Sequence, residues 1–92
     1  MSKPHPNLWH PYSQMSHLDY VPKAKSTLGS KITLENNKIL VDGTSSWWTA
    51  CHGYNHPKIL KAMKEQLDQM PHIMFGGLTH KPAEDLASKL TN

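Results

Sequence analysis

Residues 31–48 read KITLENNKILVDGTSSWW, and this stretch sets the fold of the chain. Apolar residues alternate with polar ones on both sides of Glu35-Asn36-Asn37, a segment that tolerates left-handed backbone. The alternation predicts a β-hairpin that ends at the turn Asp42-Gly43. Two adjacent tryptophans follow, Trp47 and Trp48, and on an extended backbone their side chains would point to opposite faces. One indole ring is therefore expected to face solvent, a partner or a ligand.

The length and the cysteine count predict at most one small domain without an internal disulfide. The chain has 92 residues and one cysteine, Cys51, so a reducing compartment is expected. No signal peptide and no run of about 18 apolar residues is present, which predicts a cytoplasmic protein that does not enter a membrane. The ten basic residues are all lysines, scattered along the chain, and the net charge is +3. Without arginine, nucleic-acid binding is not expected.

Residues 1–30 are expected to form an N-terminal arm. They hold four of the seven prolines and show no sustained hydrophobic period. The arm nevertheless carries several large apolar side chains, so it is expected to lie against another surface. In the segment WHPY the proline stiffens the backbone before Tyr12, whose ring then covers either a flat ligand or the domain surface. Residues 31–92 are expected to hold the hairpin, an aromatic loop and two helices.

Each of the two helices is predicted to begin with a proline in its first turn. Pro57 opens the first helix and Pro71 follows its end. Pro82 opens the second helix in the same way, and its apolar stripe continues almost to the last residue. A stripe that is still running at the end indicates an incomplete domain, and a frayed end on a small α+β protein is the alternative.

The histidines and the cysteine give weak indications of a chemical site. His52 and His56 are four residues apart, but Gly53 and Pro57 break the helix that an i, i+4 metal pair needs, so no metal site is expected. Cys51 has histidines nearby, although a lone cysteine is more often a small buried side chain than a nucleophile. Lys58, Lys61 and Lys64 lie on the solvated face of the first predicted helix and lack the desolvated pocket that a Schiff-base lysine needs.

The loop between the helices contains Met74-Phe75-Gly76-Gly77. Its glycine pair lets the backbone approach another surface closely. Contact with a ligand, contact with a second subunit and packing in the core all remain open for this loop.

Four segments together resemble one family. They are WHPY at 9–12, LVDGTSSWW at 40–48, HGYNHP at 52–57 and HIMFGGLTH at 72–80. In this order and at nearly this spacing they resemble the N-terminal part of the adenosylmethionine-8-amino-7-oxononanoate aminotransferase family, the diaminopelargonic acid synthases of biotin biosynthesis. The family lies within the class III aminotransferases, and the resemblance runs from about Leu8 to the last residue.

The resemblance implies a fold type I enzyme that depends on pyridoxal 5′-phosphate and works as a homodimer with active sites at the subunit interface. Such an enzyme moves the amino group of S-adenosylmethionine onto the cofactor and then onto 8-amino-7-oxononanoate. Carried over by motif, Trp47 would line the substrate pocket and Trp48 would flank it. Tyr12 would lie beside the cofactor and help to recognise the substrate. Three further residues would reach toward the partner subunit's active site, namely Met70, Met74 and Gly76.

The family's catalytic groups lie in later regions that this chain does not contain. These are the Schiff-base lysine, the phosphate-binding cup, the aspartate beside the pyridinium nitrogen and the arginine that binds carboxylates. The expected fold is therefore an α+β N-terminal segment of a fold type I transferase whose large α/β domain is absent. The chain alone is expected to be inactive and to hold no covalent cofactor. The alternatives are a standalone small-molecule-binding or interaction module without catalysis and a small histidine-based metal-binding protein.

Overall fold

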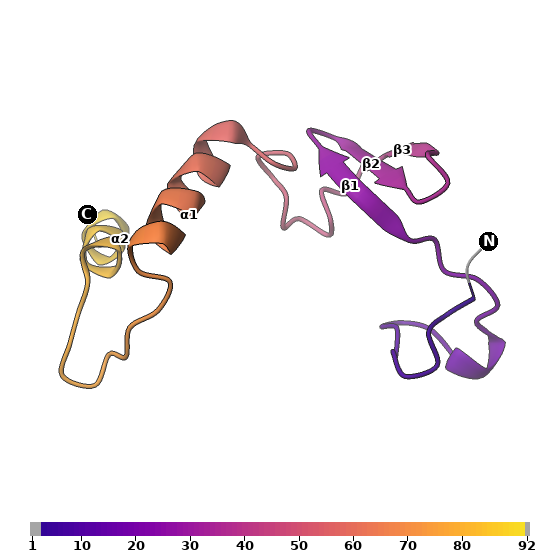
Figure 1. The fold of residues 1–92 in the computed structure, drawn as a ribbon, viewed down its shortest axis with the longest axis horizontal. Coiled ribbons are helices and arrows are strands. Elements are labelled where there is room, and N and C mark those ends of the chain that lie inside the picture. The colour runs from indigo at the N-terminus through magenta and orange to yellow at the C-terminus, as the bar shows by residue number, and fades with distance from the viewer. Residues whose placement is uncertain (1–2, 92) are drawn as a thin grey trace. The chain divides into compact units, whose positions relative to one another are not determined.

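The computed structural model describes residues 3–91 and contains a three-stranded sheet and two helices (Figure 1). Residues up to His56 form one unit, and residues from Pro57 onward form a second. The first unit contains a short 3-10 helix and all three strands, and the second contains both α-helices. In chain order the elements are η1 (Met15–His17), β1 (Ala24–Leu28), β2 (Lys31–Leu34), β3 (Ile39–Val41), α1 (Pro57–Gln69) and α2 (Lys81–Leu90).

The predicted hairpin is confirmed. Strands β2 and β3 pair in antiparallel fashion, with Ile32 opposite Leu40. Their turn is closed by the Leu34 amide, which donates to the Lys38 carbonyl oxygen at 2.9 Å. Asn37 takes a left-handed conformation in this turn, with φ +64°. Asparagine accepts such a conformation more readily than other non-glycine residues, which explains its place there.

A third strand, β1, was not expected from the sequence and lies inside the segment predicted as an arm. It pairs antiparallel with β2, so the strand order is β1-β2-β3. Its sequence AKSTL has no alternation of apolar residues, and four of its five side chains are exposed. Pairing with β2 therefore defines this strand, because backbone hydrogen bonds need no hydrophobic pattern.

The core of the first unit is very small. Leu34 is the only hydrophobic side chain in residues 3–91 that is buried, with 7% of its surface exposed. On one face of the sheet Thr27, Ile32 and Leu40 lie opposite one another and are half-buried. On the other face Leu28 and Val41 are exposed. A sheet with so little burial leaves most of its apolar surface in contact with water.

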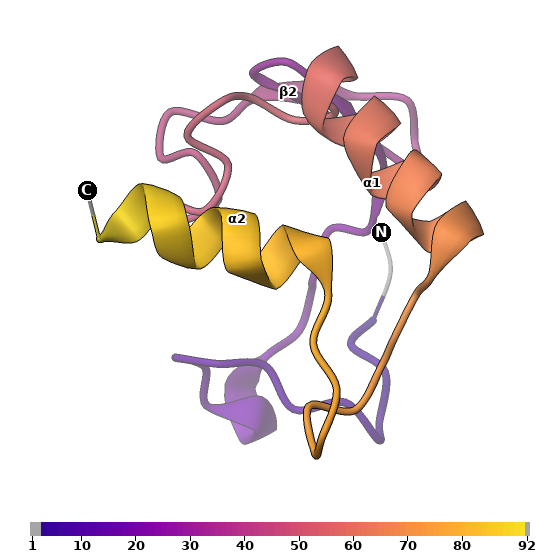
Figure 2. The same cartoon turned by 90° about the vertical axis from the view of Figure 1, so that its left-hand side faces the viewer.

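Both predicted helices are confirmed. α1 begins at Pro57 and ends before Pro71, and α2 begins at Lys81 with Pro82 in its first turn. The imidazole Nδ1 of His80 caps α2 by accepting from the Ala83 amide at 3.3 Å. Within the described residues α1 and α2 do not pack against each other, and an extended loop joins them (Figure 2).

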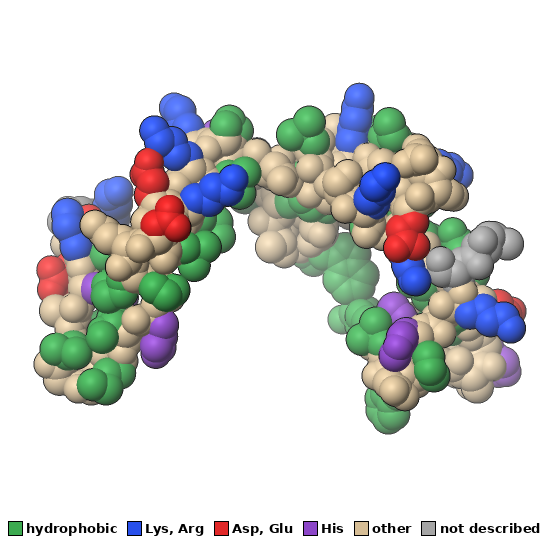
Figure 3. All heavy atoms as spheres, viewed as in Figure 1, with side chains coloured by type: hydrophobic (Ala, Val, Ile, Leu, Met, Phe, Trp, Pro, Cys, Tyr) green, Lys and Arg blue, Asp and Glu red, His purple; other side chains and the backbone are tan. Residues whose placement is uncertain are grey.

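The apolar stripes of both helices are exposed. Hydrophobic side chains are visible on the surface of each unit in Figure 3. In the second unit they include Met63, Leu67, Leu86 and Leu90. Large exposed apolar surfaces of this kind are typical of surfaces that another part of a protein covers. None of the helices in residues 3–91 is long and apolar enough to span a membrane.

Candidate functional site

The expectation of an extended backbone at the two tryptophans is wrong. Residues 45–48 all have positive φ, between +50° and +71°, and form a left-handed turn. The Trp48 amide donates to the Thr44 carbonyl oxygen at 2.9 Å, and the Ala50 amide donates to the Ser45 carbonyl oxygen at 2.8 Å. Left-handed backbone costs about 1–2 kcal/mol for each non-glycine residue. The alternation that separates neighbouring side chains on a strand therefore does not apply here.

Asp42 caps this left-handed turn. One carboxylate oxygen accepts from the Thr44 amide at 2.9 Å and from the Thr44 hydroxyl at 3.1 Å. The other accepts from the Ser46 amide at 2.7 Å and from the Tyr54 hydroxyl. The hydrogen bond from Tyr54, followed by those from the two amides, lowers the pKa of Asp42 to about 2. The same hydrogen bond to the Asp42 carboxylate raises the pKa of Tyr54.

The aromatic loop, residues 43–53, leaves and rejoins the sheet at one place. Asp42 before it donates its amide to the Ser30 carbonyl oxygen at 2.8 Å. Tyr54 after it exchanges two backbone hydrogen bonds with Gly29, at 2.8 and 2.9 Å. Gly53 has φ +80°, and a side chain there would lie 3.4 Å from the Gly29 carbonyl oxygen. The loop therefore has both ends fixed at the turn between β1 and β2, in the manner of an Ω-loop.

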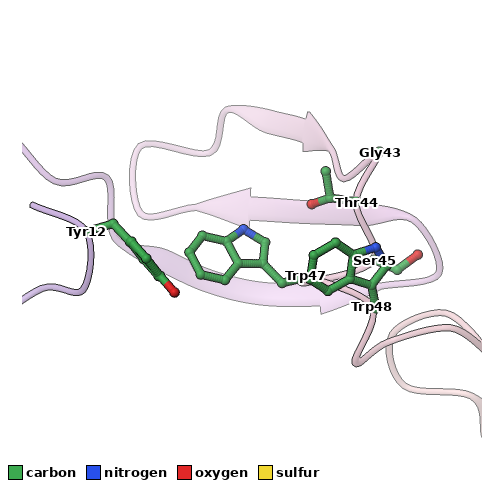
Figure 4. A pocket seen from close by; sticks show the side chains of 6 residues that line it. All are labelled: Tyr12, Gly43, Thr44, Ser45, Trp47 and Trp48. Atoms are coloured by element: carbon green, nitrogen blue, oxygen red, sulfur yellow. The ribbon is translucent and has the colours of Figure 1, made fainter.

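The structure brings Tyr12 to Trp47 from a distant part of the chain. Their ring centroids are 5.2 Å apart and the ring planes meet at 59°. A groove of about 530 Å³ lies along the rings of Tyr12, Trp47 and Trp48 (Figure 4). Gly43, Thr44 and Ser45 complete its lining. The rings are largely open to solvent, with 91% of Tyr12, 59% of Trp47 and 84% of Trp48 exposed.

Backbone strain gathers at this groove. Within residues 3–91, two of the seven non-glycine residues with positive φ are asparagines, which tolerate that conformation. The other five are Tyr12, with φ +52°, and residues 45–48. Four of those five line the groove. Strained backbone concentrates at functional sites, so the clustering supports a binding role for these aromatic residues.

A second groove, of about 610 Å³, also borders the tryptophan pair. Ile32 of the sheet and Pro11 of the N-terminal segment line it together with Asp42 and Tyr54. Trp47 and Trp48 contribute to both grooves. The two indoles thus form a wall with open space on more than one side.

The loop between α1 and α2 forms a smaller groove of about 310 Å³ in the second unit. Met70 is half-buried and lines this groove, whereas Met74 and Gly76 are exposed. Phe75 makes an edge contact with the His80 ring at a centroid distance of 5.2 Å. The predicted approach of Met70, Met74 and Gly76 to a partner subunit stays a prediction.

The reactive side chains form no catalytic cluster in the described part of the chain. The Cys51 thiol is exposed, which contradicts the buried position expected for a lone cysteine. All ten lysines are exposed, and none lines the aromatic groove. Among residues 3–91 no three histidine, cysteine or acidic side chains meet as a metal site requires. What the site offers is flat apolar surface rather than a nucleophile or base.

Asp42 and Tyr54 were not predicted as site residues. A signal was present, since an aspartate two residues before a threonine is typical of an Asx turn. The participation of Tyr54 has no signal in the sequence, because its hydroxyl reaches Asp42 across twelve residues.

A comparison of the sequence with known proteins identifies the family of this chain. The family model described as class-III aminotransferase matches residues 12–92. The chain belongs to this family. The match includes Tyr12, the aromatic loop and both helices, so the whole candidate site except Pro11 lies within it.

Several similar proteins within this family share one enzyme name. The adenosylmethionine-8-amino-7-oxononanoate aminotransferase of Buchnera aphidicola subsp. Acyrthosiphon pisum is 49% identical over 84 residues, 91% of this chain and 20% of that protein. The enzyme of the same name from Corynebacterium glutamicum is 43% identical over 96% of this chain, and that from Saccharomyces cerevisiae 38% over 91%. The resemblance predicted from the motifs is confirmed. The chain spans about a fifth of the length of these curated relatives.

Proposed function

We propose that this chain is the N-terminal segment of a pyridoxal-phosphate-dependent aminotransferase of biotin biosynthesis. The complete enzyme transfers the amino group of S-adenosylmethionine to 8-amino-7-oxononanoate and yields 7,8-diaminononanoate. The names of the relatives support this reaction, and the family match supports the class of chemistry. The complete enzyme is a cytoplasmic homodimer in this proposal, with Met70, Met74 and Gly76 at the partner subunit's active site.

The role of this chain is to supply an aromatic wall of the substrate site. The observation that carries this role is the contact between Tyr12 and Trp47 beside the groove that Trp48 extends. Indole and phenol rings offer broad, rigid apolar surfaces with one polar group at the edge. An elongated apolar substrate such as 8-amino-7-oxononanoate fits against such a surface along its methylene chain, leaving its polar ends for other groups.

The residues of this chain do not fit the attachment of the cofactor. Pyridoxal phosphate needs a desolvated lysine and donors for its phosphate, and all ten lysines here are exposed. No cationic side chain lines the aromatic groove. The electron sink that the cofactor supplies therefore depends on groups in the remaining four fifths of the enzyme. The chain alone has no transaminase activity in this proposal.

The proposal is tested by grafting residues 8–92 in place of the matching fifth of the Corynebacterium glutamicum relative. We expect the grafted enzyme to retain pyridoxal phosphate and to form 7,8-diaminononanoate. Replacing Trp47 with alanine lowers kcat/KM about tenfold or more, because the substrate loses an aromatic wall. Trp9→Ala is the matched control, since Trp9 is exposed and does not line the groove.

Two results would contradict the proposal. One is a folded graft that retains the cofactor and makes no 7,8-diaminononanoate. The other is full activity in the Trp47→Ala graft, which would remove Trp47 from the substrate wall. The 92-residue chain provides a third check: borohydride reduction in the presence of pyridoxal phosphate should label no single lysine, and selective labelling of one lysine would show that the chain binds the cofactor covalently.

A further inference from the structure

The arrangement of the substrate wall depends on how the aromatic loop is held. The Trp47 and Trp48 rings are mostly exposed, so burial does not fix their orientation. Their backbone is left-handed, a conformation that non-glycine residues adopt only when their surroundings stabilise it. The position of the rings must therefore come from the hydrogen bonds of the loop backbone.

Those hydrogen bonds converge on Asp42. Its carboxylate accepts from the amides of Thr44 and Ser46, the latter directly before Trp47. Trp48 is tied to the same turn through its amide, which donates to the Thr44 carbonyl oxygen. Asp42 thus caps the left-handed turn much as an aspartate caps the first turn of a helix.

Tyr54 connects this cap to the far end of the loop. Its hydroxyl donates to the Asp42 carboxylate, while its backbone pairs with Gly29. Asp42 is itself bonded through its amide to Ser30. Both ends of the loop therefore rest on two consecutive residues of the turn between β1 and β2. The side-chain hydrogen bond closes the loop above that base.

The same contacts exclude direct chemistry by Asp42. A carboxylate has about four lone-pair sites, and four donors from Thr44, Ser46 and Tyr54 occupy them here. No acceptor site is left for a substrate proton or a metal ion. The low pKa of Asp42, about 2, agrees with a permanently ionised acceptor rather than an acid or base.

We propose that Asp42 and Tyr54 are positioning residues whose hydrogen bond holds the aromatic loop closed and sets Trp47 against Tyr12 to form the substrate wall. The identity of the substrate rests on the proposed function, whereas the closure of the loop does not. Neither residue lines the aromatic groove formed by Tyr12, Trp47 and Trp48, so both act through the backbone of the loop.

Two variants separate positioning from a general effect on folding. Tyr54→Phe removes one hydroxyl and keeps the ring, and Asp42→Asn turns one acceptor oxygen into a donor that faces other donors. The matched controls are Tyr20→Phe and Asp68→Asn, at residues outside both grooves that border the tryptophans. Asp68 lies on α1 and its side chain is exposed.

The grafted enzyme provides the kinetic test. We expect Asp42→Asn to raise KM for 8-amino-7-oxononanoate about tenfold with little change in kcat, as for loss of uniform substrate binding. Tyr54→Phe raises KM less, and the controls leave it unchanged. A fall in apparent kcat at constant KM would indicate only a smaller folded fraction and would overturn the proposal, as would unchanged kinetics in both variants.

A second measurement does not depend on catalysis. The 92-residue chain has three tryptophans, so its indole N–H groups give three NMR signals. In Asp42→Asn we expect the signals of Trp47 and Trp48 to move to their positions in urea, while the Trp9 signal stays in place. Unmoved Trp47 and Trp48 signals would overturn the positioning role. An inactive graft with these shifts present would instead count against the proposed reaction alone.

Discussion

Different kinds of internal contact stabilise the first and the second unit of this chain. In the first unit the decisive hydrogen bonds join residues far apart in sequence, such as Gly29 with Tyr54 and Asp42 with Tyr54. In the second unit nearly every contact is local, within a helix or at its cap. The first unit carries strained backbone around an open groove, and the second carries unstrained helices with exposed apolar stripes.

This difference shows how the contacts that stabilise the chain are divided between its two units. The signals that set the ends of α1 and α2, a proline in the first turn of each and the His80 cap of α2, all act within a few residues. The aromatic loop needs several distant groups at once, because its left-handed backbone is unfavourable by itself. The aromatic loop therefore depends on more distant contacts than either helix does.

The largest expected effect is local and belongs to the second unit. Ala62→Pro places a proline inside α1, where it removes an amide donor and clashes with the preceding turn, at a cost of about 3 kcal/mol. We expect the helical circular dichroism at 222 nm to fall, while the indole signals of Trp47 and Trp48 stay unchanged. Ala62→Ser is the control and should keep the helix. Movement of both indole signals would show that the loop depends on α1.

A smaller effect is expected in the sheet. Leu34→Ala removes the only buried hydrophobic side chain of residues 3–91 and should cost about 2 kcal/mol of stability, measured by exchange of the β2 amides. Leu67→Ala on α1 should cost less than about 0.5 kcal/mol in the 92-residue chain, because Leu67 is exposed there. In the grafted enzyme Leu67→Ala should lower the stability as much as Leu34→Ala does. A small loss of stability from Leu67→Ala in both the grafted enzyme and the 92-residue chain would show that the rest of the enzyme does not cover the apolar stripe of α1.

The loop closure itself is expected to respond to a single methyl group. Gly53→Ala introduces a side chain at φ +80° and should destabilise the pairing of Gly29 with Tyr54 by about 1–2 kcal/mol. Faster hydrogen exchange of the Gly29 and Tyr54 amides is the measurement. Gly76→Ala, where φ is not positive and the space is open, should leave both rates as they are. Equal rates in the two variants would mean that Gly53 does not need its left-handed conformation.

The smallest effect on the aromatic loop is expected from lowering the pH from 7 to 4. Because the pKa of folded Asp42 is about 2, below the ordinary value of about 3.9, its ionised form stabilises the loop above that ordinary value. This contribution declines as the pH falls below that ordinary value and is gone once the pH has fallen through about 2. The Trp47 and Trp48 indole signals should therefore be nearly unchanged between pH 7 and 4 and move near pH 2. In Asp42→Asn this step should be absent, and a midpoint near pH 4 in the unmodified chain would contradict the hydrogen bonds seen at Asp42.

The predictability of each element follows the range of the interactions that form it. Both helices and the β2–β3 hairpin were predicted, because prolines, periodicity and an Asn-Asn turn act over a few residues. β1 was missed, since its exposed polar sequence takes its structure from pairing with β2. The aromatic residues of the site were named from motifs, but their backbone was predicted as extended and is left-handed.

By itself the sequence determined the family, the two helices, the β2–β3 hairpin and the presence of flat aromatic side chains at Trp47 and Trp48. Only the tertiary structure decided that Tyr12 meets Trp47 and that Asp42 and Tyr54 close the loop between them. The physical reason is that helices and tight turns are stabilised by neighbours in the chain. The groove instead depends on contacts that span 12 to 35 residues, and these form only when the sheet brings their partners together.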